Sequence, residues 1–133
     1  MISTKGRYAL RVMIDLAEQP EGTLVPLKEI AQRQGISKKY LEIIVKALVT
    51  SGLVAGTSGR GGGYRLTRTP GEYPIGEILE VMEGTLSPVA CLADSDYACE
   101  RARECRTLPL WKEFYTLVTD FFYGKTVEDL LQR

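Results

Sequence analysis

The stretch IAQRQGISKKYLEIIVKALVTSGLVAGTSGRGGGYRLT, residues 30–67, decides the fold. Gly35 ends a short amphipathic segment, and Ser37 is a good N-cap for the helix that follows, over about 38–50. Apolar residues recur there at i, i+3, i+4 and i+7, so one face should lie in the core: Leu41, Ile44, Val45 and Leu48. Two β-prone runs, Leu53–Ala55 and Tyr64–Thr67, then flank a loop with four glycines and one arginine.

Helix, turn, helix and hairpin, in this order, predict a winged helix-turn-helix. A helix over residues 4–18 precedes them. Its apolar stripe contains Leu10, Met13, Leu16 and Ala17, with Tyr8, Ala9 and Val12 close beside it. YPIGEILEVMEG predicts a further helix after the hairpin, and TVEDLLQ predicts a short one with a capping box between Thr126 and Asp129. The segment between them that contains the cysteines reads as irregular structure.

A long helix over about 108–123 has one broad apolar face. Its members are Leu110, Phe114, Leu117, Val118, Phe121 and Phe122. An isolated amphipathic helix does not stay folded in water, so this face must pack on the core or on a second copy of the chain. We expect a dimerisation helix, with packing on the core as the alternative.

The predicted fold class is mainly α: a winged helix-turn-helix with a β-hairpin wing, plus a long C-terminal dimerisation helix. We expect three regions within one compact unit. They are a DNA-binding region over 1–70, a connecting helix and cysteine loop over 71–106, and the dimerisation and C-terminal helices over 107–133.

Charge is distributed unevenly along the 133 residues, although the net charge is zero. Residues 1–70 carry 11 Lys and Arg against 5 Asp and Glu, whereas residues 71–133 carry 6 against 12. A basic half predicts contact with a polyanion; the alternatives are chance variation and mutual neutralisation of the halves. No apolar run is long enough to span a membrane and no secretory signal is apparent, so we expect a soluble, cytoplasmic protein without a membrane partner.

Basic side chains of the helix over 38–50 suit a DNA-facing surface. Lys38, Lys39 and Lys46 can neutralise phosphates, and Glu42 can accept a hydrogen bond from cytosine N4. In the glycine-rich loop, Arg60 can enter a narrow minor groove. A solvated helix face and a merely flexible hairpin are the alternatives. The loop is neither a P-loop, because Gly-Lys-Ser/Thr is absent, nor a dinucleotide fingerprint, because a strand follows it.

Three cysteines, Cys91, Cys99 and Cys105, lie within fifteen residues, and the chain has no histidine. Their spacing matches neither the close pairs of zinc sites nor that of plant-type ferredoxins. Nor is there a histidine to act as base for a catalytic thiol. By spacing alone, free thiols and metal ligands remain equal alternatives.

The motifs together carry a family resemblance. TKGRYALRVMIDLA, IAQRQGISKKYLEIIVKALVTSGLV, RGGGYRL, IGEILEVMEG and three cysteines followed by LW resemble the Rrf-type winged-helix regulators, and within them the iron–sulfur cluster regulators. The resemblance covers about residues 1–130. It implies a homodimer that binds double-stranded palindromic promoter DNA and holds one iron–sulfur cluster per subunit, 2Fe–2S rather than 4Fe–4S.

Site residues follow from the resemblance position by position. Cys91, Cys99 and Cys105 match the cluster ligands. The family's recognition helix matches Ser37, Lys38, Lys39, Tyr40 and Glu42, and its wing loop contains Arg60, displaced from the usual arginine position.

The fourth cluster ligand does not transfer. Leu108 stands where cluster-bearing relatives place a histidine, and Arg7 stands where nitric-oxide-sensing relatives place an aspartate. An exogenous thiol, water or a loop carboxylate could serve instead, the carboxylates being Asp94, Asp96, Glu100 and Glu104.

We therefore expect a transcriptional regulator, a repressor of iron–sulfur cluster biogenesis or related genes, that senses through its cluster. It is expected to be neither an enzyme nor a binder of a small-molecule substrate. The alternatives are a cluster-free regulator controlled by thiol chemistry or a partner protein, and a nitric-oxide-responsive regulator.

Overall fold

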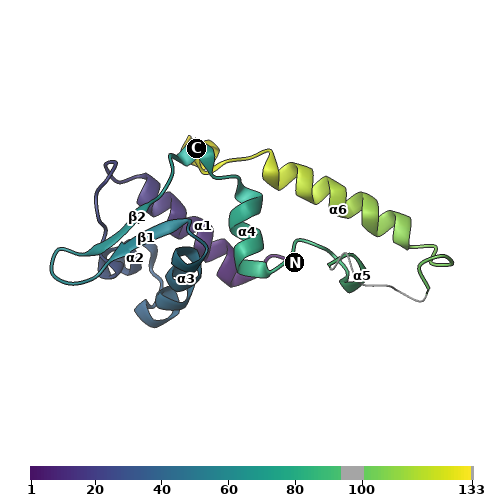
Figure 1. Cartoon of the computed structure of the whole chain (residues 1–133), viewed down its shortest axis with the longest axis horizontal. Coiled ribbons are helices and arrows are strands. Elements are labelled where there is room, and N and C mark those ends of the chain that lie inside the picture. Colours follow the sequence, from purple (N-terminus) through teal and green to yellow (C-terminus); the bar gives the residue numbers. More distant parts are fainter. Residues whose placement is uncertain (94–100, 133) are drawn as a thin grey trace.

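The computed structural model describes residues 1–93 and 101–132. A body of helices carries a two-stranded hairpin at one end, and one long helix extends away at the other (Figure 1). The elements of the body, in chain order, are α1 (Thr4–Ala17), α2 (Leu27–Gln34), α3 (Lys38–Thr50), β1 (Val54–Thr57), β2 (Gly63–Leu66), a 3-10 turn η1 (Pro70–Glu72) and α4 (Ile75–Glu83). Three helices follow: α5 (Ala90–Ala93), α6 (Leu108–Tyr123) and α7 (Val127–Leu131).

The helix boundaries follow from local capping chemistry. Ser3 caps α1 by accepting the Gly6 N–H, and Gly35 ends α2 in the left-handed region at φ 65°. The Ser37 side chain then accepts the Tyr40 N–H at the start of α3, as the sequence predicts. Thr126 and Asp129 form the predicted capping box of α7.

The hairpin pairs β1 with β2 antiparallel, from Val54 opposite Leu66 to Thr57 opposite Gly63. Both strands are displaced from the predicted runs, because the backbone ladder continues through Gly56 and pairs Thr57 with Gly63, and glycine has little strand propensity. Gly63 is required at its position: a Cβ there would lie 2.6 Å from the backbone of Val25, which bridges to Tyr64.

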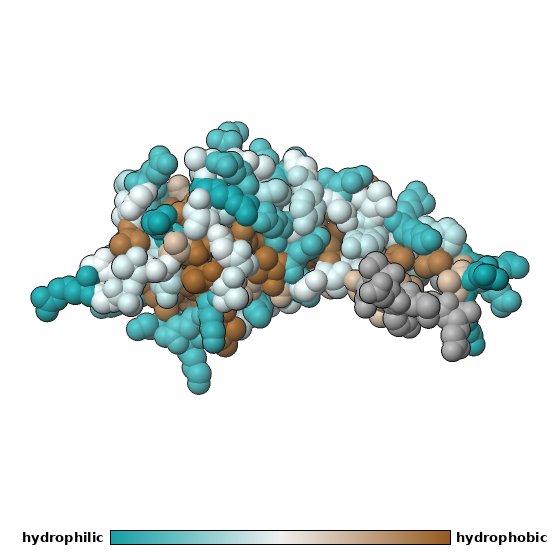
Figure 2. All heavy atoms as spheres, in the orientation of Figure 1, coloured by the Kyte–Doolittle hydropathy of each residue, from teal (hydrophilic) through white to brown (hydrophobic). Residues whose placement is uncertain are grey.

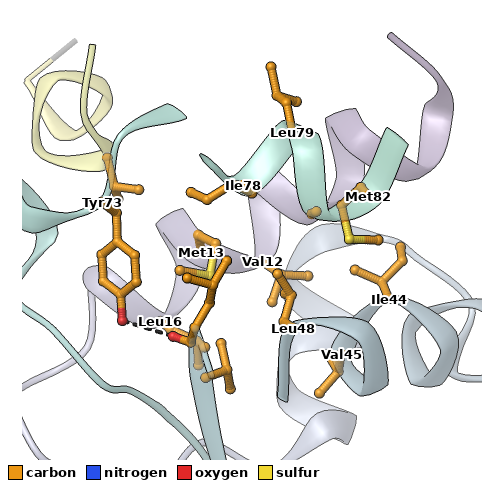
Figure 3. Packing of buried hydrophobic residues seen from close by; sticks show 14 of the residues in the cluster. Val12, Met13, Leu16, Ile44, Val45, Leu48, Tyr73, Ile78, Leu79 and Met82 are labelled. Atoms are coloured by element: carbon orange, nitrogen blue, oxygen red, sulfur yellow. Dashed lines mark hydrogen bonds between the residues drawn. The ribbon is translucent and has the colours of Figure 1, made fainter. Parts of the chain in front are cut away.

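The core lies where α1, α3 and α4 meet (Figure 3). The face of α3 predicted to be buried is buried in full: Leu41, Ile44, Val45 and Leu48. The stripe predicted on α1 was off-centre, because α1 packs against α4 as well as α3. Its buried apolar side chains are Ala9, Val12, Met13 and Leu16, whereas Leu10 and Ala17 are half-buried at the edges.

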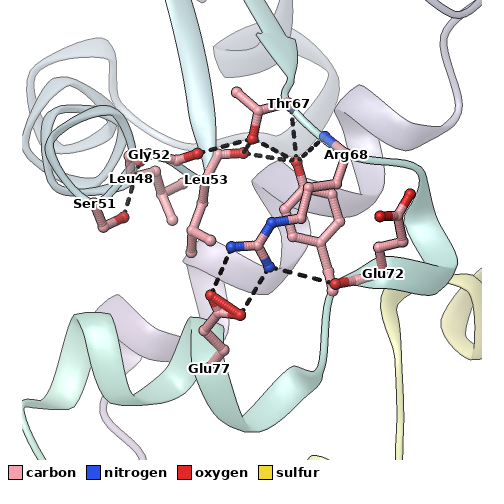
Figure 4. Close-up of polar contacts among 9 residues, drawn as sticks. Leu48, Ser51, Gly52, Leu53, Thr67, Arg68, Glu72 and Glu77 are labelled. Atoms are coloured by element: carbon pink, nitrogen blue, oxygen red, sulfur yellow. Dashed lines mark hydrogen bonds and ion pairs between the residues drawn. The ribbon is translucent and has the colours of Figure 1, made fainter.

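Tyr73 joins the hairpin to the helices, and its bonding partners Leu53, Thr67 and Arg68 are labelled in Figure 4. Its side chain is fully buried, and its hydroxyl donates to the Leu53 carbonyl at 2.8 Å while it accepts the N–H groups of Thr67 and Arg68 at 2.8 and 2.9 Å. Arg68 makes a bidentate ion pair with Glu77, at 2.8 and 2.9 Å. This network fixes the base of the wing on α4.

Two elements differ from the predictions in the second half. The cysteine segment is not wholly irregular, since α5 forms one helical turn at Cys91. The predicted apolar face of α6 divides in two: Val118 is buried and Phe122 half-buried toward the body, whereas the other members are exposed. None of the described helices is long and apolar enough to cross a membrane.

Candidate nucleic-acid interface and cysteine segment

The solvent face of α3 carries most of the side chains predicted to contact DNA. Lys38, Lys39, Glu42 and Lys46 are all exposed. Over the described ranges, none of these four side chains has an ion-pair partner within 4 Å. Their charges are therefore directed to solvent and available to an external partner.

Tyr40 is different, because it is half-buried and its ring meets that of Tyr8 edge to face, with centroids 5.8 Å apart. This packing ties the first turn of α3 to α1. Tyr40 therefore positions α3 against α1, and Ser37 caps the same turn of α3 by accepting the Tyr40 N–H.

A shallow hollow separates α3 from the wing. Its volume is about 390 Å³, and Glu42, Lys46 and Tyr64 are among the residues that line it. Arg60 is exposed in the loop between β1 and β2, beyond this hollow. The fold thus brings Glu42 and Lys46 to one side of the hairpin, whereas Arg60 lies in the loop that connects its two strands.

The orientation of α2, and through it of α3, depends on a residue that sequence reasoning missed. Asp15 of α1 is buried, with 2% of its surface exposed. It accepts two hydrogen bonds from Arg33, at 3.0 and 2.9 Å, and one from the Gln34 amide at 2.9 Å. A charge on the apolar side of a predicted helix was the available signal, because buried carboxylates require partners.

Ile43 was also missed. It is 52% exposed on the outward face of α3, between the lysines. In the sequence, Ile43 follows Lys39 by four residues and precedes Lys46 by three. This spacing places it on the same helix face as the two lysines.

The cysteine segment lies between α4 and α6, and the structure describes two of its three thiols. Cys91 is half-buried in α5, and Cys105 is half-buried just before α6. Cys99 lies outside the described residues, as do Asp94, Asp96 and Glu100. Glu104 is exposed, Leu108 begins α6, and Arg7 is an exposed residue of α1 that donates to the Thr4 hydroxyl.

Hydrogen bonding lowers the pKa of Cys105. The Thr107 hydroxyl lies 3.3 Å from its sulfur, backbone N–H groups of Thr107 and Leu108 point at it, and the Arg101 charge acts in the same direction. These contacts favour the thiolate, which is the form of cysteine that ligates metals. In the described ranges no three potential ligands converge.

An apolar row runs along α6 on the side away from the body. Leu110, Phe114, Leu117 and Phe121 are 56%, 38%, 66% and 58% exposed, at i, i+4, i+7 and i+11. Figure 2 shows apolar surface over the body and again toward the α6 end of the molecule. Such a continuous apolar row on one helix is a typical interaction surface.

The fold and the charged face of α3 define a winged helix-turn-helix regulator of transcription. Residues 2–133 match the family model of Rrf2, described as an iron-dependent transcriptional regulator, and the chain belongs to this family. The HTH-type transcriptional regulators IscR of Vibrio vulnificus and Cronobacter sakazakii are each 35% identical over 130 residues, which cover 98% of this chain and 76% and 79% of those proteins.

Solved structures agree. CymR of B. subtilis, described as a global cysteine regulator, superposes with a TM-score of 0.80 at 39% identity, covering 99% of this chain and 96% of that one. IscR of T. potens gives 0.77 at 33% identity, covering 99% and 86%. The predicted winged-helix fold is confirmed, as is a DNA-binding regulator rather than an enzyme.

Proposed function

We propose that this regulator is a homodimer that binds palindromic promoter DNA through α3 and the wing, as a repressor whose promoter affinity depends on an iron–sulfur cluster. The observation that carries the DNA part is the face of α3, where three lysines surround Glu42 without any intramolecular ion pair in the described ranges. Lysines supply affinity for phosphates on any sequence. An unpaired carboxylate penalises every site that offers it no donor, so Glu42 supplies selectivity.

Two lysine-bearing helices must be held at a fixed spacing to contact a palindrome. The exposed row of α6 is suited to this, because a second α6 packed on it would bury four large apolar side chains. The position of α6 would then determine the separation of the two α3 helices. Binding to chromosomal DNA places the protein in the cytoplasm.

Cys91, Cys99 and Cys105 are the residues we propose as cluster ligands. The donor set fits in chemistry: three cysteines lie close in sequence, and the contacts of Cys105 favour its thiolate. A bound 2Fe–2S cluster supplies redox sensitivity and lability at this position. The chain itself connects the first ligand, in α5, to the last, just before α6. A cluster bound between them would therefore determine the position of α6.

Spectroscopy on the anaerobically purified chain tests the cluster directly. We expect visible absorption with stoichiometric iron and sulfide, lost in Cys91→Ser, Cys99→Ser and Cys105→Ser variants together with promoter selectivity. Ser87→Ala, in the same connection but without a thiol, is the matched control. Cysteine variants that keep both metal content and selectivity would contradict the proposal.

Salt titration tests the DNA surface separately. Replacing Lys46 with Ala should weaken binding to all duplexes and reduce the salt slope by about one ion, because one phosphate contact is lost. Glu42→Gln should instead relax selectivity while strengthening binding to unrelated duplexes. Unchanged selectivity of the Glu42→Gln variant would show that Glu42 does not contact the bases.

A second candidate is a cluster-free regulator controlled by oxidation of its thiols. The observation that favours it is the lowered pKa of Cys105, because thiolates are the reactive form. The similar CymR of Staphylococcus aureus has a structure described as an oxidized form, at 30% identity. This candidate predicts a colourless protein under anaerobic conditions whose DNA affinity changes reversibly with peroxide and dithiothreitol.

A further inference from the structure

Ile43 occupies the centre of the solvent face of α3. The buried side chains of this helix, from Leu41 to Leu48, define the opposite face. Lys39, Ile43, Lys46 and Thr50 follow one another at i, i+4, i+7 and i+11, so they form a single outward row. All four are exposed, and Ile43 is 52% exposed.

A branched aliphatic side chain in this place contributes nothing to the core. Scattered apolar residues on a surface are ordinary, but this one lies in the row that an α-helix presents to the major groove when it binds DNA. In that groove the base pairs present hydrogen-bonding groups and one apolar group, the C5-methyl of thymine. Aliphatic side chains are therefore suited to thymine and to no other base.

The neighbouring charges indicate which partner covers Ile43. Lys39 precedes it by one turn and Lys46 follows it by one turn, and neither has an ion-pair partner in the part of the chain that the structure describes. An apolar protein surface placed on Ile43 would have to accommodate two uncompensated ammonium groups. A DNA duplex accommodates them on its phosphates while its groove floor faces the side chain between them.

A protein partner is the alternative to DNA as the occupant of this surface, because a shallow hollow lies beside the row. Ile43, Ala47 and Val81 contribute its apolar lining, and its volume is about 510 Å³. Lys46 also lines it. The hollow opens toward α4 and could receive an apolar side chain of a protein partner, so the experiment must distinguish the two occupants.

We propose that Ile43 recognises a thymine in each half-site by contact with its C5-methyl group, close to the base pair that Glu42 contacts. This inference rests on the proposed DNA interface and names one base to which that interface responds. Burying one methyl group changes affinity by about fourfold, so two symmetric half-sites give about fifteenfold in all.

The test uses the full chain, purified anaerobically, and duplexes that it selects from a random pool. Each thymine of the selected site is then replaced by deoxyuridine, symmetrically in both half-sites, which removes the methyl and leaves base pairing intact. For the wild-type protein, one such replacement should weaken binding by about fifteenfold. Ile43→Ala should bind the thymine duplex as weakly as the wild type binds the deoxyuridine duplex, and should be insensitive to the replacement.

Val49→Ala is the matched control, because Val49 is an exposed aliphatic residue of the same helix, 38% exposed, that lines the hollow toward the wing instead of the outward row. It should keep the full response to deoxyuridine. If Ile43→Ala retains that response, or if no thymine methyl affects wild-type binding, the inference is wrong while the DNA interface stands. If the chain selects no duplex, the proposed interface fails and the inference with it.

Discussion

At the scale of single residues, two buried side chains, Asp15 and Tyr73, join elements of the body by polar contacts. Asp15 pairs with Arg33 and Gln34, and Tyr73 bonds to Leu53, Thr67 and Arg68. Helical spacing is sufficient to predict the buried face of α3, but it contains no information about such pairings.

Tyr73→Phe should destabilise the chain by about 3 kcal/mol, because the N–H groups of Thr67 and Arg68 lose their side-chain partner and the Leu53 carbonyl keeps only the Thr67 hydroxyl, at 3.3 Å. Urea unfolding followed by circular dichroism measures the loss. Tyr64→Phe is the control, since over the described residues the Tyr64 hydroxyl has no hydrogen bond, and it should change stability by less than about 0.5 kcal/mol. Equal effects of the two substitutions would contradict the role given to Tyr73.

Glu77→Gln should lower stability at pH 7 by about 1 kcal/mol, since the pair with Arg68 is bidentate but about one third exposed. The hydrogen bonds from Arg68 hold the pKa of Glu77 below its ordinary value of 4.5. A lowered folded-state pKa contributes stability that is present above the unfolded-state value and is lost as the pH falls through the folded-state value. The stability difference between wild type and variant should thus be present above pH 4.5 and disappear as the pH falls through the lowered pKa of Glu77. Glu21→Gln, exposed in the loop after α1, should show no such difference.

At the scale of elements, the ends of helices could be predicted where local capping residues determine them. The ends of the strands were missed, because contacts between distant segments determine them. The bounds of α3 and α6 follow from Ser37 and from the apolar run, and both agree with the structure. The strands of the wing do not, because pairing with the opposite strand carries Gly56 and Thr57 into the ladder. The close approach of Gly63 to Val25 is likewise visible only in three dimensions.

Gly63→Ala should displace the wing, since the added Cβ would meet backbone atoms of Val25 and Pro26 at 2.6 and 2.9 Å, and backbone cannot yield as a side chain does. We expect a loss of about 1–3 kcal/mol in stability, as for overpacking, and weaker DNA binding measured at a temperature where the variant is still folded. Ser58→Ala, exposed in the same hairpin, should be neutral in stability. Normal DNA affinity of a destabilised Gly63→Ala would show that the wing does not contact DNA.

At the scale of the whole molecule, α6 stands apart from the body and contacts it mainly through α4. The sequence predicted the apolar face of α6. It could not show which of its members pack on the body, because that depends on the angle at which α6 crosses α4. Val118 and Phe122 turn inward, and the row from Leu110 to Phe121 remains for a partner. The cluster ligands were predicted by resemblance, and the ligand set remains a proposal.

Leu117→Glu should convert the proposed dimer to a monomer, because it places a charge at the most exposed position of the apolar row. Light scattering after gel filtration measures the mass, for which the wild type should give twice the 14.8 kDa of one chain. Thr116→Glu adds the same charge on the polar side of α6 and should remain dimeric. A wild type that is monomeric at micromolar concentration would overturn the proposed dimer.

The return of α7 to the body has a consequence for how the protein is made. Ile75 donates its N–H to Lys125 at 2.8 Å, Val127 donates to Tyr73 at 3.1 Å, and the Val127 side chain is fully buried. The body therefore closes around a segment that leaves after α4 and comes back only at Thr126, and closing so long a loop delays folding. On the ribosome, α2 and α3 emerge early, but the body that contains them lacks part of its core until residues 126–131 have followed. A nascent chain thus completes its winged-helix body only after its cysteines and α6 have been synthesised, so no fully folded winged-helix body precedes the segments that we propose regulate it.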